Sequence, residues 1–418
     1  MFRIRRRTIL TSLGILLLAS VLLLQLPAFK SRAGWRYEVW STYLRNVVDP
    51  VGPMPTPVRS TPLPSPSALP STPTSEASVV PSATELALPA RASLPAPEYE
   101  RQGINNCGPA TLAMTLRMYG WEGDQYDIAR IIKPIDKDRN VNPEELRYYV
   151  LNEAGWLRAE YRVAGDVKLL RRLIAANYPV IIEAATTIDP QDAMGPADDL
   201  WAAHYLIVTA YDDETLTITA HDPLRGPDKK IPYDQLMEDW KPFSYLYMLI
   251  YLPEDEAEVA SIVGENWDAD ANRQNALTIA QEATAADPGD AFAWFNFGST
   301  LVYFERYEEA AQAFDTAFTL GLPQRMTRYQ FWPFVAYYNA DHIDYLLQLT
   351  ENTYRVINGQ YSEEALLWHG YGLLRKGDVD GAGAAWNKAL SVHPRYCDAE
   401  RAINDFIALS YDLTGCSP

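Results

Sequence analysis

The stretch HYLIVTAYDDETLTITAHD, residues 204–222, decides the fold of the middle of the chain. Two runs rich in β-branched and aromatic residues flank an acidic turn, which is the pattern of a β-hairpin. With Asp213 at the centre of the turn, His204 is expected directly opposite Asp222, with Cβ atoms about 5 Å apart. That separation allows a hydrogen bond between the carboxylate and the imidazole, although a single β-bulge would shift the register.

Further helices and strands surround this hairpin. Segments 142–155 and 166–177 each begin with a residue that can cap a helix, and both are expected to be helical. Strands are expected at 180–184, 205–211, 215–220 and 245–251. Helices followed by antiparallel strands indicate an α+β domain, which we place at residues 98–252.

A cysteine lies at the start of another expected helix, in QGINNCGPATLAM, residues 102–114. Pro109 suits the first turn of this helix, and Gly120 suits its end. Cys107 is therefore expected at the helix N-terminus, where unpaired N–H groups and the helix dipole favour thiolate over thiol. A cysteine nucleophile requires this environment. The alternative is a buried and inert cysteine.

A cysteine nucleophile also needs a base and a group that orients the base. His204 is the expected base and Asp222 the orienting acid, whereas His221 points to the other face by strand alternation and is expected to be structural. Gln102 is expected to donate its side-chain N–H to an oxyanion, beside the backbone N–H of Cys107. Taken singly, a lone histidine is usually a core residue and a loop glutamine is usually solvated.

These motifs resemble a known family. CGPATLAM, YPVIIEA and HYLIVTAYDD followed by HDP are similar to the papain-like cysteine peptidases of the bacteriocin-processing, double-glycine leader type, in their peptidase-like branch. The resemblance covers about residues 98–252. It implies that Gln102 is the oxyanion donor, Cys107 the nucleophile, His204 the general base and Asp222 the orienting acid.

The chain departs from the leader peptidases in two respects. Asn106 occupies a position where those enzymes often have an acid, and no G-x-x-x-x-G-K-[ST] motif for an ATP-binding cassette follows. An export-coupled role is therefore in doubt, while the implied chemistry is not. That chemistry needs no metal or other cofactor, and the sequence has no Cys/His cluster with the spacing of metal ligands.

Residues 257–418 have the pattern of helix pairs in the 34-residue tetratricopeptide repeat (TPR). The clearest copy contains Trp294, Phe297, Gly298, Ala310, Phe314 and Ala317. Other copies contain Gly264 and begin at Glu363, and residues 325–362 are expected to be a degenerate repeat. The expected all-α repeat domain either binds a peptide, substrate or protein partner on its concave surface or packs on its neighbour.

The N-terminal part of the chain is expected to export and anchor the rest. Residues 1–7 are a basic cytoplasmic stub, and residues 8–29 are uncharged over a length that crosses about 30 Å of hydrocarbon. A juxtamembrane segment, 30–49, comes next. Residues 50–97 contain 13 prolines among Ser, Thr and Ala, and are expected to form an extended linker. The alternative is a cleaved signal peptide and a secreted protein.

Two features leave alternatives open. The loop at 186–199 is rich in Asp and Pro, and either borders the substrate cleft or simply connects two strands. Cys397 and Cys416 lie near the C-terminus of a chain that we expect to be exported, where they either form a disulfide or remain separate thiols.

Charge narrows the class of partner. The chain carries a net charge of −18 although residues 1–36 hold seven basic residues and no acid, so nucleic acid is not expected as a partner. The patterns favour a membrane-anchored, extracytoplasmic cysteine peptidase or amidohydrolase that acts on peptide or amide bonds, with the repeats positioning a protein substrate or partner. The alternative is a catalytically silent adaptor that binds peptides or proteins.

Overall fold

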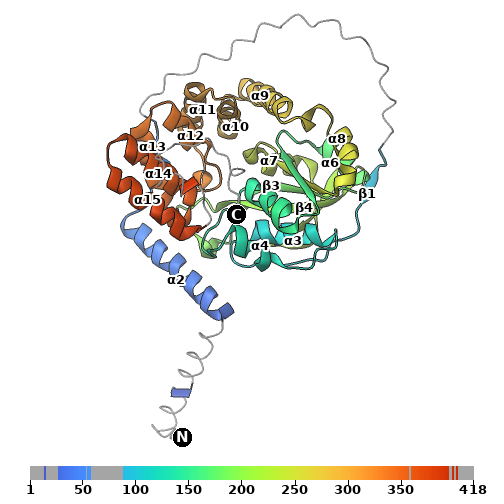
Figure 1. The fold of residues 1–418 in the computed structure, drawn as a ribbon, viewed down its shortest axis with the longest axis horizontal. Coiled ribbons are helices and arrows are strands. Elements are labelled where there is room, and N and C mark those ends of the chain that lie inside the picture. Colours follow the sequence, from blue (N-terminus) through green and yellow to red (C-terminus); the bar gives the residue numbers. More distant parts are fainter. Residues whose placement is uncertain are drawn as a thin grey trace, which may run out of the picture. The chain divides into compact units, whose positions relative to one another are not determined.

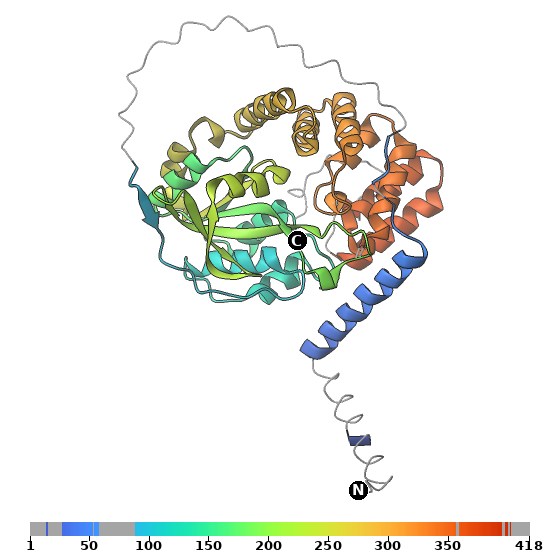
Figure 2. The same cartoon turned by 180° about the vertical axis from the view of Figure 1, so that it is seen from behind.

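The computed structural model describes residues 14–15, 27–52, 54–57, 88–356, 359–394, 398–399 and 402. The chain divides into two compact units, which are considered separately below. The small unit comprises residues 1–51 and 188–200, and the large unit comprises residues 52–187 and 201–418. Figures 1 and 2 show the ribbon from two opposite sides.

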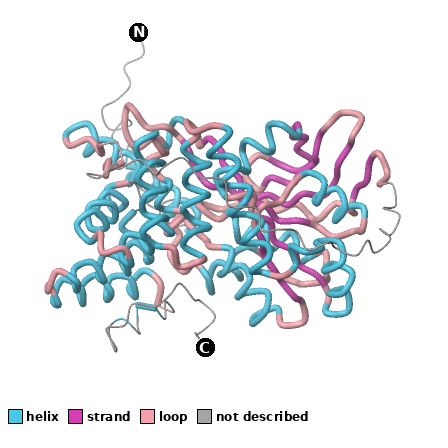
Figure 3. The backbone as a smooth tube through the Cα atoms, turned by 90° about the horizontal axis from the view of Figure 1, so that it is seen from above, coloured by secondary structure: helices cyan, strands magenta, loops and turns pink. Residues whose placement is uncertain are grey.

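Seven strands of the described residues form one antiparallel sheet in the large unit (Figure 3). Their order is β2-β7-β3-β4-β5-β6, and β1 pairs with the far end of β4. The strands are β1 Arg91–Ser93, β2 Arg158–Arg162, β3 Val180–Thr187, β4 Trp201–Asp212, β5 Thr217–Asp222, β6 Gly226–Pro232 and β7 Tyr247–Tyr251. All four expected strands are present. Because β1 belongs to the sheet, residues 91–93 are not part of the linker in which we had placed them.

The register of the β4–β5 hairpin differs from the prediction. Asp212 pairs with Thr217, so the turn is centred beyond Asp213, and a bulge lies between Val208 and Ala210. This shift means that His204 is not directly opposite Asp222, and on the other edge of β4 His204 pairs with Ala184 of β3. The predicted register was therefore wrong by two positions. An even shift preserves strand alternation, which leaves His204 and Asp222 as diagonal neighbours.

Helices cover both faces of the sheet (Figure 1). One face packs against α3 Cys107–Arg117, α4 Gln125–Ile132 and α5 Pro143–Tyr149, and the other against α6 Val167–Ala175, α7 Tyr233–Trp240 and α8 Glu256–Val263. Successive side chains of β3 point to opposite faces of the sheet. Val180 and Ile182 enter the core on the side of α6, α7 and α8, whereas Ile181 enters the core on the side of α3, α4 and α5. Both expected helix starts are confirmed, with Asn142 capping α5 and Asp166 capping α6.

The C-terminal part of the large unit is helical. Its helices are α9 Ala269–Ala286, α10 Ala291–Tyr303, α11 Tyr307–Leu320, α12 Trp332–Asn339, α13 Ile343–Arg355, α14 Glu363–Arg375 and α15 Val379–Val392. In two helix pairs a glycine allows an aromatic ring to approach closely. A Cβ on Gly298 would lie 2.8 Å from the Phe314 ring, and one on Gly370 would lie 2.2 Å from the Trp386 ring. Gly298 and Phe314 both belong to the clearest expected repeat copy.

The expected copy around Gly264 lacks this contact. Gly264 ends α8 with a φ of +73°, and no other atom would lie within 4 Å of a Cβ built on it. The assignment of the helical part to the tetratricopeptide repeats remains a prediction.

Polar contacts hold the helical part against the sheet within the large unit. Asn272 of α9 donates to the carbonyl of Val163 at 2.9 Å and accepts from the Val163 N–H at 3.1 Å. Asn296 of α10 donates to the Lys241 carbonyl at 2.8 Å. Met54, which we had placed in the linker, is 5% exposed in the core of the helical part.

In the small unit, the loop that connects β3 and β4 contacts the helix α2 Pro27–Val48. The Asn46 side chain donates to the Met194 carbonyl at 2.7 Å, and Arg36 forms an ion pair with Asp192 at 2.9 Å. Within the described ranges, no helix combines the length and apolar character needed to cross a bilayer. The expected anchor at 8–29 lies mostly outside the described residues, as do Cys397, Cys416 and most of the linker.

Candidate active site

Cys107 is the first residue of α3 and is partly exposed. The helix lies directly against β4, because a Cβ on Gly108 would be only 3.3 Å from the Tyr205 ring and from Val141. The Thr111 hydroxyl donates to the Tyr205 carbonyl at 3.1 Å and fixes the first turn of α3 on the strand. The thiol is therefore held beside β4, at the end of the helix where its ionised form is favoured.

His204 and Asp222 are buried and hydrogen-bonded to each other, each 3% exposed. His204 Nε2 lies 2.8 Å from Asp222 Oδ1, which leaves Nδ1 for another partner. The His204 side chain also forms a hydrogen bond with Cys107. The structure thus joins thiol, imidazole and carboxylate in one chain of contacts, through a register that the sequence did not predict.

The turn after β5 holds the Asp222 carboxylate. The backbone N–H groups of Leu224 and Arg225 donate to Asp222 Oδ1 at 2.8 and 2.9 Å. Burial alone would raise the pKa of Asp222, but the hydrogen bond and charge of His204 and these two N–H donors lower it to about 2. Asp222 is therefore ionised at neutral pH and favours the protonated imidazole.

The pKa values of the thiol and the imidazole shift in opposite directions. Burial would raise the pKa of Cys107, but its hydrogen bond with His204 and the charge of that ring lower it overall. Burial would lower the pKa of His204, but its hydrogen bonds with Asp222 and Cys107 raise it to about 9. Both shifts favour a thiolate–imidazolium pair at neutral pH.

Gln102 lies beside the turn that carries Asp222. Its backbone N–H donates to the Pro223 carbonyl at 2.8 Å, and its side-chain oxygen is buried with no hydrogen-bond partner among the described residues. Asn106, at the position where leader peptidases often have an acid, donates to Gln125 at 2.8 Å. The expected oxyanion role of Gln102 remains a prediction.

Two residues near the thiol escaped the sequence analysis. Gln125 is 2% exposed, and its side-chain oxygen accepts from Gly103 at 2.6 Å and from Asn106, so it organises the loop before Cys107. Glu183 is 5% exposed on β3, pairs with Tyr205, and is close enough to Cys107 for the two charges to interact. An acid within the apolar run YPVIIEA was the available indication for Glu183.

His221 lies apart from this site, with its Nδ1 4.0 Å from Asp228. Burial lowers its pKa. Among the described residues, one group of possible metal ligands has its ligand atoms within 4.8 Å of one another, namely Glu145, Glu363 and His393. None of these three is among the predicted site residues.

The fold and these contacts define a class: an α+β domain in which a helix-terminal thiol contacts a histidine–carboxylate pair. Residues 91–248 match the family model described as "Peptidase_C39 like family". This match supports a papain-like cysteine peptidase domain over those residues. A search of the curated proteins found no match.

Among solved structures, the chain is similar to a protein from Bacillus anthracis that is described as a C39-like peptidase. The two sequences are 17% identical, and the TM-score is 0.31. The similar region covers 38% of this chain and 96% of that one.

Proposed function

We propose that residues 91–248 hydrolyse peptide or amide bonds through Cys107, His204 and Asp222. The observation that carries this proposal is the unbroken contact from the Cys107 thiol through His204 to Asp222, with the His204–Asp222 distance of 2.8 Å. The match to the peptidase family over the same residues supports it. A merely structural cysteine needs neither an imidazole partner nor a lowered pKa.

In the proposed reaction, the Cys107 thiolate attacks the carbonyl carbon of the scissile bond, and the carbonyl electron pair moves to oxygen. The Cys107 backbone N–H and the Gln102 side-chain N–H donate to that oxygen. The His204 imidazolium gives its proton to the leaving amine as the C–N bond breaks. His204 then removes a proton from water, which attacks the thioester and releases the acid.

The remaining parts of the chain give this reaction a location. An anchor at residues 8–29 would hold the enzyme at the outer side of the cell membrane, with the linker extending from it. The helical part is proposed to be a tetratricopeptide array that positions a protein substrate or partner.

Alkylation by iodoacetamide tests the proposal without knowledge of the substrate. Cys107 of the purified protein is expected to react rapidly at pH 6–8, and His204→Ala is expected to slow this reaction at least about tenfold, because the thiol then loses its charged partner. His221→Ala is the matched control and should leave the rate unchanged. A Cys107 rate equal to that of a free thiol in a peptide, or indifferent to His204→Ala, would contradict the proposal and favour an adaptor.

A further inference from the structure

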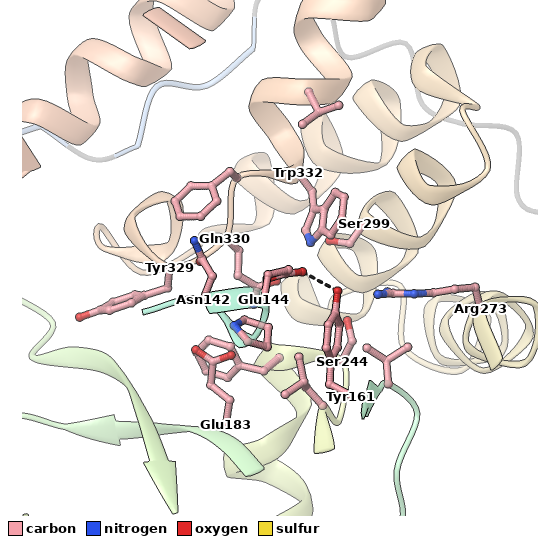
Figure 4. A pocket seen from close by; sticks show the side chains of 16 residues that line it. Asn142, Glu144, Tyr161, Glu183, Ser244, Arg273, Ser299, Tyr329, Gln330 and Trp332 are labelled. Carbon is pink, nitrogen blue, oxygen red and sulfur yellow. Dashed lines mark hydrogen bonds between the residues drawn. The ribbon is translucent and has the colours of Figure 1, made fainter. Parts of the chain in front are cut away.

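A pocket lies in the large unit between the sheet and the helical part, with about 610 Å³ of empty space, a volume that includes space open to solvent (Figure 4). The sheet side contributes Glu183 and Tyr161, and α5 contributes Glu144. The helical part supplies Arg273 of α9 and Trp332 at the start of α12. Both parts of the large unit are therefore needed to form it.

Acidic groups from two elements enter this pocket. Glu144 accepts a hydrogen bond from the Tyr161 hydroxyl at 2.6 Å (Figure 4), and Arg273 provides a positive charge close enough to act on it. Glu183 differs, since no ion pair joins it to a basic side chain in the part of the chain that the structure describes. Burial, then the negative charges of Cys107 and Glu144, raise its pKa well above the usual value for a glutamate.

A buried carboxylate without a cation is costly unless a partner or a proton compensates its charge. The Tyr205 hydroxyl lies beside Glu183, but its single hydrogen is donated to the Val141 carbonyl at 2.9 Å. The pocket thus has a place for a positive charge beside Glu183. Aromatic side chains around it, including Trp332, can stabilise such a charge through their ring faces.

The pocket is next to the candidate active site. Glu183 pairs with Tyr205 on β4, one position before the pair formed by Ala184 and His204. Asn142, another lining residue, follows Val141, which packs at the position of Gly108. Glu183 is also close enough to Cys107 for the two charges to interact, and this proximity is the ground for assigning a substrate side chain to the pocket.

We infer that this pocket is a specificity subsite for a primary amine, such as a lysine side chain, whose ammonium group pairs with Glu183. This inference rests on the proposed peptidase function, because it assigns the subsite to the substrate of Cys107. The flexible four-carbon stem of lysine would lie along the aromatic wall while the ammonium group reaches the carboxylate.

Tripeptide chloromethyl ketones test the inference. Each reagent carries lysine or its uncharged isostere norleucine at one of three positions, with alanine at the others, and the inactivation rate of Cys107 is measured. At one position, lysine is expected to react about ten- to a hundredfold faster than norleucine, the range for a hydrogen-bonded charge. Glu183→Gln should remove this preference, so that the lysine and norleucine reagents inactivate the variant at equal rates. The exposed Glu153 serves as control through Glu153→Gln.

The outcomes separate this inference from the proposed function. Equal lysine and norleucine rates at all three positions, with alkylation still dependent on His204, would overturn the subsite and leave the peptidase proposal standing. If alkylation is independent of His204, the subsite is tested without catalysis, by calorimetric binding of the lysine tripeptide amide to the Cys107→Ala variant. Binding that is lost in the additional Glu183→Gln variant supports the subsite, and equal binding of the norleucine peptide refutes it.

Discussion

The His204 side chain has two polar partners, Asp222 and Cys107. Nε2 is 2.8 Å from the Asp222 carboxylate, and the ring also forms a hydrogen bond with the Cys107 thiol. The carboxylate orients the ring and favours its protonated form, and the protonated ring in turn stabilises the thiolate. The ionisation of the Cys107 thiol therefore depends on Asp222, which acts on the thiol through His204.

Asp222→Asn should change the pH dependence of Cys107 alkylation. With the carboxylate charge removed, the pKa of His204 falls from about 9 and the pKa of Cys107 rises, so less thiolate is present at low pH. At pH 6 the iodoacetamide rate should fall about tenfold for each unit by which the thiol pKa rises. At pH 9.5 the native and variant rates should converge.

Asp228→Asn is the matched control for this profile, because the Asp228 side chain is 72% exposed and lies near His221. Its profile should coincide with that of the native protein. A variant Asp222→Asn whose rate is lowered equally at every pH would mean that the carboxylate acts on geometry alone.

At the residue level, the sequence predicted contacts between residues of distinctive chemistry, while the catalytic roles of those residues stay predictions. The contacts of Cys107, His204 and Asp222 follow the expected order, because a helix-terminal cysteine and a histidine–acid pair are visible in sequence. Glu183 and Gln125 were missed because their importance comes from burial, which only the packed chain defines. The oxyanion role of Gln102 stays a prediction.

Among the elements, α3 and β4 determine the position of the thiol. Their close approach depends on Gly108, since a Cβ there would be 3.3 Å from both Tyr205 and Val141. Real Cβ atoms rarely approach other heavy atoms so closely, and a packed neighbour can yield only a little.

Gly108→Ala should therefore move α3 away from β4 and separate Cys107 from His204. We expect slower alkylation at pH 7 and a loss of about 1–3 kcal/mol in the free energy of unfolding from overpacking. Gly383→Ala is the matched control in α15, because a Cβ there has no neighbour within 4 Å and alanine favours the helix. An unchanged alkylation rate in Gly108→Ala would contradict this prediction, because β4 would then have shifted enough to make room for the added methyl group.

Strands with apolar runs were predictable, and the others were not. β2 reads RAEYR and β6 reads GPDKKIP, so charges, glycine and proline conceal both from an argument based on apolar alternation. The hairpin register failed because neither the centre of the turn nor the bulge after Val208 has a clear pattern in the sequence.

In the whole molecule, buried acids lie where α5 of the sheet part meets α14 of the helical part. Asn142 donates to Glu364 at 2.6 Å across this interface. Burial, then the negative charge of Asp138, raises the pKa of Glu364 to about 8. The neighbouring Glu145 and Glu363 have pKa values raised well above the usual value for the same leading cause, burial.

Stability should consequently fall as the pH rises from about 5 to 8.5. A carboxyl whose pKa is about 8 in the folded state and near its usual value when unfolded binds more protons in the folded state over this range. Its stabilising contribution is complete below the unfolded pKa and is lost as the pH passes through the folded pKa. The thermal unfolding midpoint of Glu364→Gln should vary less steeply with pH than that of the native protein.

The exposed Glu351 provides a control, because Glu351→Gln should retain the native slope. If plots of the unfolding midpoint against pH are parallel for the native protein and Glu364→Gln, the assignment of this pH dependence to the interface is refuted.

The attachment of Met54 to the helical core and of β1 to the sheet has a consequence for proteolysis. Met54 is packed in the helical core of the large unit, and Arg91–Ser93, after the intervening segment, pair with β4 of the same unit. A single nick in the intervening proline-rich segment would therefore break the covalent chain without by itself freeing the peptidase part. Separation of the two fragments would additionally require the packed ends to detach.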